Sequence, residues 1–134
     1  MIGCDTNILV RAALDDNPRE AKIAKQLLTK LAAEKKLFIA SYAILEMVWV
    51  LKIKKRTRHE ICEAVLTLLD SVGVTVSQRE IVTTALEMYS NGKADFGDYL
   101  ILAEGQFNGA ASLASFDKDL CKDNHHAKHP KKYL

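Results

Sequence analysis

The sequence has few cysteines, no long apolar run and little net charge, and each of these shortages excludes a class of protein. Its 134 residues include only three cysteines, Cys4, Cys62 and Cys121. The number is odd and no pair has C-x-x-C spacing, so neither a disulfide framework nor a zinc ribbon is predicted. A formal net charge of +2 gives no bulk electrostatic reason to expect nucleic-acid binding.

Targeting and membrane signals are also missing from the sequence. No apolar run approaches the length of a membrane span. Asp5 and Arg11 interrupt any apolar core of a signal peptide, so we expect no such peptide. Together with the cysteine pattern, these absences predict a cytoplasmic protein that does not associate with membranes.

The composition, with 49% apolar and 27% charged residues, is that of a folded globular protein. A chain of this length suits one compact domain. We therefore expect a single domain over residues 1–134, in which residues 124–134 form a loosely held basic tail. That tail contains three lysines, three histidines and no acidic side chain.

Hydrophobic periodicity predicts strands that alternate with helices. Helix starts are predicted at Asn17 with Pro18, at Ser41, and at a capping box of Ser77 with Glu80. Strands separated by helices predict a parallel, doubly wound α/β sheet. The strands are predicted at residues 1–4, 37–40, 74–76 and 109–117, and the helices at residues 18–36, 42–54, 58–72, 77–92 and 94–109.

Acidic side chains gather near one edge of this predicted sheet. Asp5 follows the first strand, Asp117 follows the last strand, and Glu46 lies early in the helix after the second strand. Asp95 and Asp98 are three residues apart at the start of a later helix, on one face. Ligand sites in open α/β sheets lie at the carboxyl ends of strands, so we expect these carboxylates to converge. Ligands that are all oxygen favour Mg²⁺ or Mn²⁺.

Each acid also has a simpler interpretation. Glu46 interrupts the apolar stretch YAILEMVWVL at residues 42–51, and a carboxylate is rarely fully buried without a partner. A bound metal ion would compensate its charge, and a buried lysine or arginine would do the same. Asp5 is alternatively a turn residue or a helix cap, while Asp95 and Asp117 are alternatively caps of the segments that follow them.

The ordered set of motifs resembles the PIN-domain ribonucleases, and among them most the VapC-type toxins of toxin–antitoxin pairs. The motifs are D-T-N at residues 5–7, a lone glutamate in the helix after the second strand, A-D-F-G-D at residues 94–98, and S-F-D at residues 115–117. The resemblance covers essentially the whole chain. It implies a three-layer α/β/α fold around a central parallel sheet of four to five strands.

The resemblance also implies roles for individual residues. It implies a quartet that binds metal and performs catalysis, and an accessory set that supports the quartet. The quartet is Asp5, Glu46, Asp98 and Asp117. The accessory residues are Asp95, Thr6, Asn7 and Ser115. The implied reaction is hydrolysis of an RNA phosphodiester by water that one or two Mg²⁺ ions activate, with Mn²⁺ as a substitute.

Two further features predict partners. A basic cluster is predicted either to contact the RNA backbone or to be a solvated helix end. The helix at residues 42–54 is apolar nearly all round, which predicts cover by a second chain. The resemblance supplies two candidates, a second copy in a homodimer and a cognate VapB-like antitoxin laid between the helices at 42–54 and 58–72. The basic cluster comprises Lys52, Lys54, Lys55, Arg56 and Arg58.

Other families with an aspartate after the first strand fit less well. A haloacid-dehalogenase-type phosphatase requires a second aspartate two residues after the first, where this chain has Asn7. A response-regulator receiver requires an acidic pair before its phosphoacceptor strand, and the chain has none. A flap-type DNA nuclease requires more helices than the chain has room for. Two alternatives stay open: a non-toxin PIN-domain nuclease of RNA processing, and a non-catalytic α/β binding domain.

Overall fold

The computed structural model describes all residues from 1 to 134, and its chain divides into two compact units. The first unit is Met1–Arg79 and the second is Glu80–Leu134. Helices alternate with short strands through most of the chain, and every strand pair is parallel. The α/β class and the parallel pairing predicted from the sequence are therefore confirmed.

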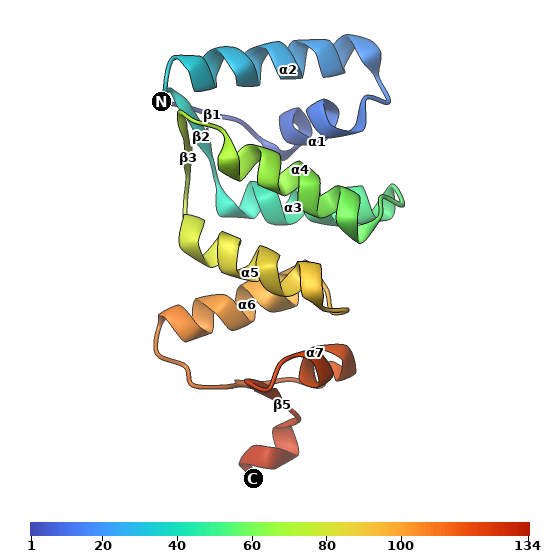
Figure 1. The fold of residues 1–134 in the computed structure, drawn as a ribbon, viewed down its shortest axis with the longest axis vertical. Coiled ribbons are helices and arrows are strands. Elements are labelled where there is room, and N and C mark those ends of the chain that lie inside the picture. Colours follow the sequence, from blue (N-terminus) through green and yellow to red (C-terminus); the bar gives the residue numbers. More distant parts are fainter. The chain divides into compact units, whose positions relative to one another are not determined.

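A three-stranded parallel sheet lies at one side of the first unit (Figure 1). Its order is β1 (Ile2–Gly3), β2 (Leu37–Ile39), β3 (Val74–Val76). The backbone N–H of Cys4 donates to the Phe38 carbonyl at 3.1 Å and extends the first pair by one residue. Because the strands are parallel, the residues that follow all three strands lie at the same edge of this sheet.

Four helices connect these strands in pairs. Helices α1 (Thr6–Leu14) and α2 (Pro18–Ala33) lead from β1 to β2, and α3 (Ser41–Ile53) and α4 (Arg58–Asp70) lead from β2 to β3. Helix α1 packs against α2 and α3, while α3 also packs against α4. The core of the unit is aliphatic, and its most deeply buried side chains are Leu9, Leu37, Ile39, Ile44, Met47, Leu51, Ile61 and Val65.

Helix α1 is a correction to the sequence prediction, which places a polar turn after the first strand and no helix before residue 18. In the structure the carboxylate of Asp5 accepts the backbone N–H of Ile8 at 3.3 Å, and so caps the helix N-terminus. The helix buries Leu9, Val10 and Leu14. A polar residue that caps a helix resembles a turn in the sequence, because both use the same side-chain acceptors.

The predicted caps at Ser41 and Ser77 are also different in the structure. Ser41 is the first residue of α3, and its backbone N–H donates to the hydroxyl oxygen of Ser77 at 2.8 Å. The Ser41 hydroxyl donates to the side chain of Gln78 at 3.2 Å. Ser77 therefore satisfies the start of α3 and forms no capping box with Glu80. The capping box that the structure contains lies at the start of α4.

The second unit combines helices with a two-stranded parallel sheet. Three aromatic rings meet in its core: Tyr89 lies edge to face with Phe96 at a centroid distance of 5.7 Å, and with Tyr99 at 6.5 Å. The five strands of the chain thus form sheets of three and two strands, where the sequence predicts one sheet of four to five. The elements are α5 (Arg79–Asn91), α6 (Phe96–Phe107), β4 (Leu113–Ala114), α7 (Lys118–Asp123), β5 (Ala127–Lys128) and the 3₁₀ helix η1 (Pro130–Tyr133).

Residues 124–134 are ordered, which corrects the prediction of a loosely held tail. Strand β5 pairs with β4, and the Ser115 N–H donates to the Lys128 carbonyl at 2.9 Å. The hydroxyls of Ser112 and Tyr133 are hydrogen-bonded at 2.6 Å. The C-terminal segment is therefore attached to β4 through β5 and to Ser112, the residue before β4, through Tyr133. No helix anywhere in the chain has the length and apolar character needed to span a membrane.

Candidate active site

Asp5 lies at the carboxyl end of β1, where it is the N-cap of α1. The helix-cap alternative is therefore correct for this residue. Its Oδ1 accepts the Ile8 N–H, which leaves Oδ2 for a ligand. Burial, and secondly the negative charge of Asp5, raise the pKa of the Cys4 thiol. Thr6 and Asn7 form the first turn of α1.

Glu46 lies on the exposed face of α3 and not in the core. The sequence predicts that a second chain covers part of this helix, and in the structure one face of α3 is buried within the chain while another is exposed. Glu46 makes no hydrogen bond or ion pair, so the predicted buried ion pair is wrong and the carboxylate is accessible. It shares its face with three exposed apolar side chains at helical spacing: Tyr42, Trp49 and Ile53, which are 75%, 64% and 55% exposed.

Asp95 and Asp98 lie at the N-terminus of α6. Asp95 occupies the N-cap position, but its side chain makes no capping hydrogen bond, so the predicted capping role is wrong. Asp98 is half-buried in the first turn, and its N–H donates to the Asp95 carbonyl at 3.0 Å. A negative charge is favourable at this end of a helix, because the unpaired N–H groups carry partial positive charge.

Asp117 repeats the local arrangement of Asp5 in the second unit. It follows β4 and caps α7, with Oδ1 accepting the Leu120 N–H at 2.8 Å. The Ser115 hydroxyl oxygen accepts the Asp117 N–H at 3.0 Å, and the Cys121 thiol donates to the Ser115 carbonyl at 3.5 Å. The cap alternative is correct here too. Hydrogen bonds within the segment thus orient the Asp117 carboxylate and leave Oδ2 for a ligand.

A further acid, Asp123, holds the loop that precedes α6, and sequence analysis did not identify it. One oxygen of Asp123 accepts the Lys93 N–H at 2.8 Å and the hydroxyl proton of Tyr99. The Tyr99 oxygen in turn accepts the Ala94 N–H at 3.1 Å. These contacts position the residues immediately before Asp95. No local pattern reveals them, because Tyr99 and Asp123 are 24 residues apart.

The four acids of the predicted quartet are divided between the two units. Asp5 and Glu46 belong to the first unit, and Asp98 and Asp117 belong to the second. No group of three or more His, Cys, Asp or Glu side chains is arranged to hold a metal ion. The metal site therefore stays a prediction. Its donor chemistry suits a hard divalent cation, since all four side chains supply carboxylate oxygens.

The basic cluster lies at the end of α3 and in the loop that follows. Lys52 is in the last turn of α3 and Lys54 is its C-cap, so both are placed favourably for the helix dipole. The Arg56 guanidinium donates to the Leu14 carbonyl at 3.3 Å and ties this loop to the end of α1. The helix-end alternative therefore fits part of the cluster, and the RNA contact stays a prediction. The exposed members are Lys52, Lys54, Lys55 and Arg56, while Arg58 is half-buried.

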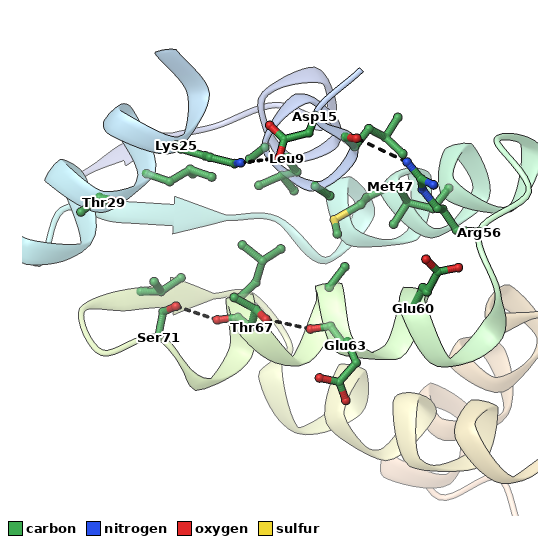
Figure 2. Close-up of a pocket in the computed structure, with 18 of the residues that line it drawn as sticks. Leu9, Asp15, Lys25, Thr29, Met47, Arg56, Glu60, Glu63, Thr67 and Ser71 are labelled. Atoms are coloured by element: carbon green, nitrogen blue, oxygen red, sulfur yellow. Dashed lines mark hydrogen bonds and ion pairs between the residues drawn. The ribbon is translucent and has the colours of Figure 1, made fainter. Parts of the chain in front are cut away.

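A cavity of about 750 Å³ opens in the first unit between α2 and α4 (Figure 2). At its rim the ammonium group of Lys25 forms an ion pair with Asp15 at 2.7 Å, and the side chains of Glu60 and Glu63 line the α4 side. Its volume falls within the range of ligand sites in proteins. The floor is apolar and includes Leu9, Leu28, Leu37, Met47, Leu51 and Leu68.

Comparison with known families gives one match. The sequence model of the PIN domain matches residues 2–123, which covers nearly all of the first unit, most of the second unit and all four predicted acids. A search of curated proteins found no match. PIN domains are generally nucleases and typically use divalent metal ions. The match ends at Asp123, the acid that holds the loop before α6.

Proposed function

Because the chain belongs to the PIN-domain family, we propose that it is a metal-dependent endoribonuclease and the toxin of a toxin–antitoxin pair. The observation that carries the nuclease proposal is the repeated strand–aspartate–helix arrangement at Asp5 and Asp117. Each carboxylate follows a parallel strand and is oriented by an N–H three residues later. Each retains one oxygen at the carboxyl end of the strands of its own sheet, the kind of position where α/β proteins bind ligands.

In the proposed site Asp5, Glu46, Asp98 and Asp117 supply the ligands of Mg²⁺, or of Mn²⁺ in its place. Such an ion, when bound, would lower the pKa of water and would neutralise phosphate charge. Asp5 and Asp117 contribute carboxylates whose orientation is already set by their caps. Glu46 contributes an exposed carboxylate on a longer side chain, and one carboxylate of the site accepts the proton of the attacking water. That this quartet acts as one site is supported by the family and by the order of the motifs.

The test is cleavage of single-stranded RNA by Asp5→Asn and Asp117→Asn. Asparagine is as good an N-cap as aspartate, so both helix caps are kept while the ligand charge is removed. We expect cleavage to fall by about 100-fold or more, the scale on which a positioned catalytic group acts. Asp70→Asn, an exposed aspartate at the end of α4, is the matched control and should cleave normally.

Wild-type cleavage should require Mg²⁺ or Mn²⁺ and should stop in EDTA. Cleavage that persists in excess chelator would contradict a metal-dependent mechanism. Near-normal cleavage by either asparagine variant would contradict the quartet, even if the protein proves to be a nuclease.

The sequence prediction lays a cognate VapB-like antitoxin between α3 and α4; we propose instead that a segment of it occupies the cavity between α2 and α4. Its apolar floor and charged rim suit an amphipathic helix, which lays its apolar face into a groove. The side chain of Thr67 lines this cavity (Figure 2). Thr67→Arg should fill the cavity and prevent co-purification with the antitoxin, whereas Leu66→Arg, next to it but outside the cavity, should not. No complex with the wild-type chain would contradict the antitoxin proposal itself.

We also propose that a second copy of the chain covers the apolar end of α3 in a homodimer. Trp49 and Ile53 are both largely exposed there and lie four residues apart on one face. Sedimentation at micromolar concentration should give a dimer for the wild type and a monomer for Ile53→Asp. A wild-type monomer at that concentration would contradict the proposal.

A further inference from the structure

The segments that follow β4 and β5 bring two exposed rings together next to Asp117. The parallel pair continues one residue beyond β4, since the Ser115 N–H donates to the Lys128 carbonyl at 2.9 Å. The next residues, Phe116 and His129, consequently meet edge to face, with ring centroids 5.4 Å apart and planes at 85°. Phe116 is 77% exposed, so its ring is open to solvent and contributes little to the core.

Contacts with the C-terminal 3₁₀ helix hold the His129 ring in place. His129 is the N-cap of η1, and its Nδ1 accepts the Lys131 N–H at 3.1 Å. The hydrogen bond between Tyr133 and Ser112 fixes the end of η1 against the residue before β4. His129 therefore holds the exposed Phe116 ring in position before any ligand arrives, and the face of this ring is the platform. Such a platform loses little conformational entropy on binding.

Both rings line a cavity of about 550 Å³ that also includes Asp117. Lys118 and Lys122 line it too, together with Asp119, and residues 124–134 contain three lysines and no acidic residue. An aromatic ring beside cationic side chains is the combination that holds single-stranded nucleic acids, because bases stack on the ring and phosphates pair with the cations.

We propose that the Phe116 ring, held edge to face by His129, forms a stacking subsite for one unpaired base of the RNA, with Lys118 and Lys122 at the adjoining phosphates. This inference rests on the proposed ribonuclease function and adds to it the place where a substrate base binds. Every base has a π face, so the subsite selects unpaired nucleotides over duplex and not one base over another. Its position next to Asp117 puts the stacked nucleotide close to a carboxylate of the proposed site.

An apolar protein partner fits this surface less well than RNA. Single exposed apolar side chains are common and carry no meaning by themselves. Phe116, however, is the only large apolar side chain in the lining of this cavity, whose other members are polar, charged or small. A protein interface would require a wider apolar patch, whereas one stacked base requires only the ring.

The test is binding of a fluorescent oligouridine of about ten nucleotides to the full chain, measured by anisotropy in EDTA and low salt. Metal-dependent cleavage does not occur under these conditions. Phe116→Ala should weaken binding about 5- to 150-fold, the range seen when a stacked aromatic is removed. Phe116→Leu should weaken it similarly, because leucine is apolar but has no π face, and Phe116→Trp should retain it. Phe107→Ala, at the exposed end of α6, is the control and should bind normally.

A second oligomer with the same phosphates but no bases separates stacking from charge. Wild type and Phe116→Ala should bind this abasic oligomer equally. The inference is overturned if Phe116→Ala and Phe116→Leu bind oligouridine as tightly as the wild type, or if the wild type does not prefer oligouridine to the abasic oligomer. Metal-dependent cleavage is measured separately, so the proposed function can stand when the subsite fails.

Discussion

The hydroxyl of Tyr99 donates a hydrogen bond to the carboxylate of Asp123, and this contact joins α6 to the end of α7. Gly92 lies against both groups, and a Cβ at this position would overlap the Tyr99 hydroxyl. The same carboxylate accepts the Lys93 N–H. The loop that leads to Asp95 therefore depends on a tyrosine, an aspartate and the absence of a side chain at position 92.

Gly92→Ala should lower the free energy of unfolding by about 1–3 kcal/mol, because a methyl group forced into a packed site displaces its neighbours. Urea denaturation measures this change. Gly105→Ala is the matched control, since Gly105 lies within α6 and its added Cβ would meet only the Ala110 Cβ, at 3.4 Å. This control should raise the free energy of unfolding by about 0.5–1 kcal/mol, the difference between glycine and alanine in a helix. Equal effects of the two variants would contradict the close contact at Gly92.

Asp5 has a structural role that can be separated from its proposed catalytic role. Asp5→Ala removes the cap of α1 and should lower the free energy of unfolding by about 0.5–2 kcal/mol. Asp5→Asn should leave stability nearly unchanged, because its side-chain oxygen still accepts the Ile8 N–H. Both variants should fail to cleave RNA. Equal stability of the two proteins in urea would show that the cap contributes nothing.

Divalent metal should stabilise the wild-type protein against heat. A ligand at about 100 times its dissociation constant adds roughly 2.7 kcal/mol to the free energy of unfolding. Calorimetry across a titration of Mg²⁺, and of Mn²⁺, should show a rising melting temperature, with a smaller rise for Asp98→Asn. A wild-type melting temperature that stays constant throughout both titrations would contradict a site that binds metal without RNA.

Acid should weaken the start of α4 through one glutamate. Hydrogen bonds from Thr57 lower the pKa of the Glu60 carboxyl from the ordinary 4.5. The bond from the Thr57 backbone N–H contributes most, and the bond with the Thr57 hydroxyl comes second. A carboxyl with a lower pKa in the folded state stabilises the protein above its unfolded pKa, and this contribution is lost as pH falls through the folded value. Stability of Glu60→Gln should therefore fall less than that of the wild type between pH 5 and pH 3, about the range of such titrations.

Glu63→Gln is the control for this prediction, because the Glu63 side chain lies on the same helix and makes no capping hydrogen bond. It should follow the wild-type pH dependence in urea denaturation. Identical acid profiles for Glu60→Gln and the wild type would show that the capping box does not act through the charged carboxylate.

Features that depend on neighbours a few residues apart were determined by the sequence alone. Asn17 with Pro18 predicts the start of α2, and in the structure the Asn17 side chain accepts the Glu20 N–H at 3.2 Å. The cap alternatives for Asp5 and Asp117 are correct for the same reason, since each partner lies three residues away. The alternation of strands and helices, which depends on apolar periodicity within each segment, also follows from the sequence.

Features that depend on partners far apart in the chain were decided only by the tertiary structure. The cap of Ser41 by Ser77 joins residues 36 apart, and the pairing of β4 with β5 turns an expected tail into a strand. The exposure of Glu46 is of the same kind. An apolar stretch shows that α3 packs against something, but which face it buries depends on where α1 and α4 lie. Burial is a property of the surroundings of a side chain, and a local sequence pattern does not contain them.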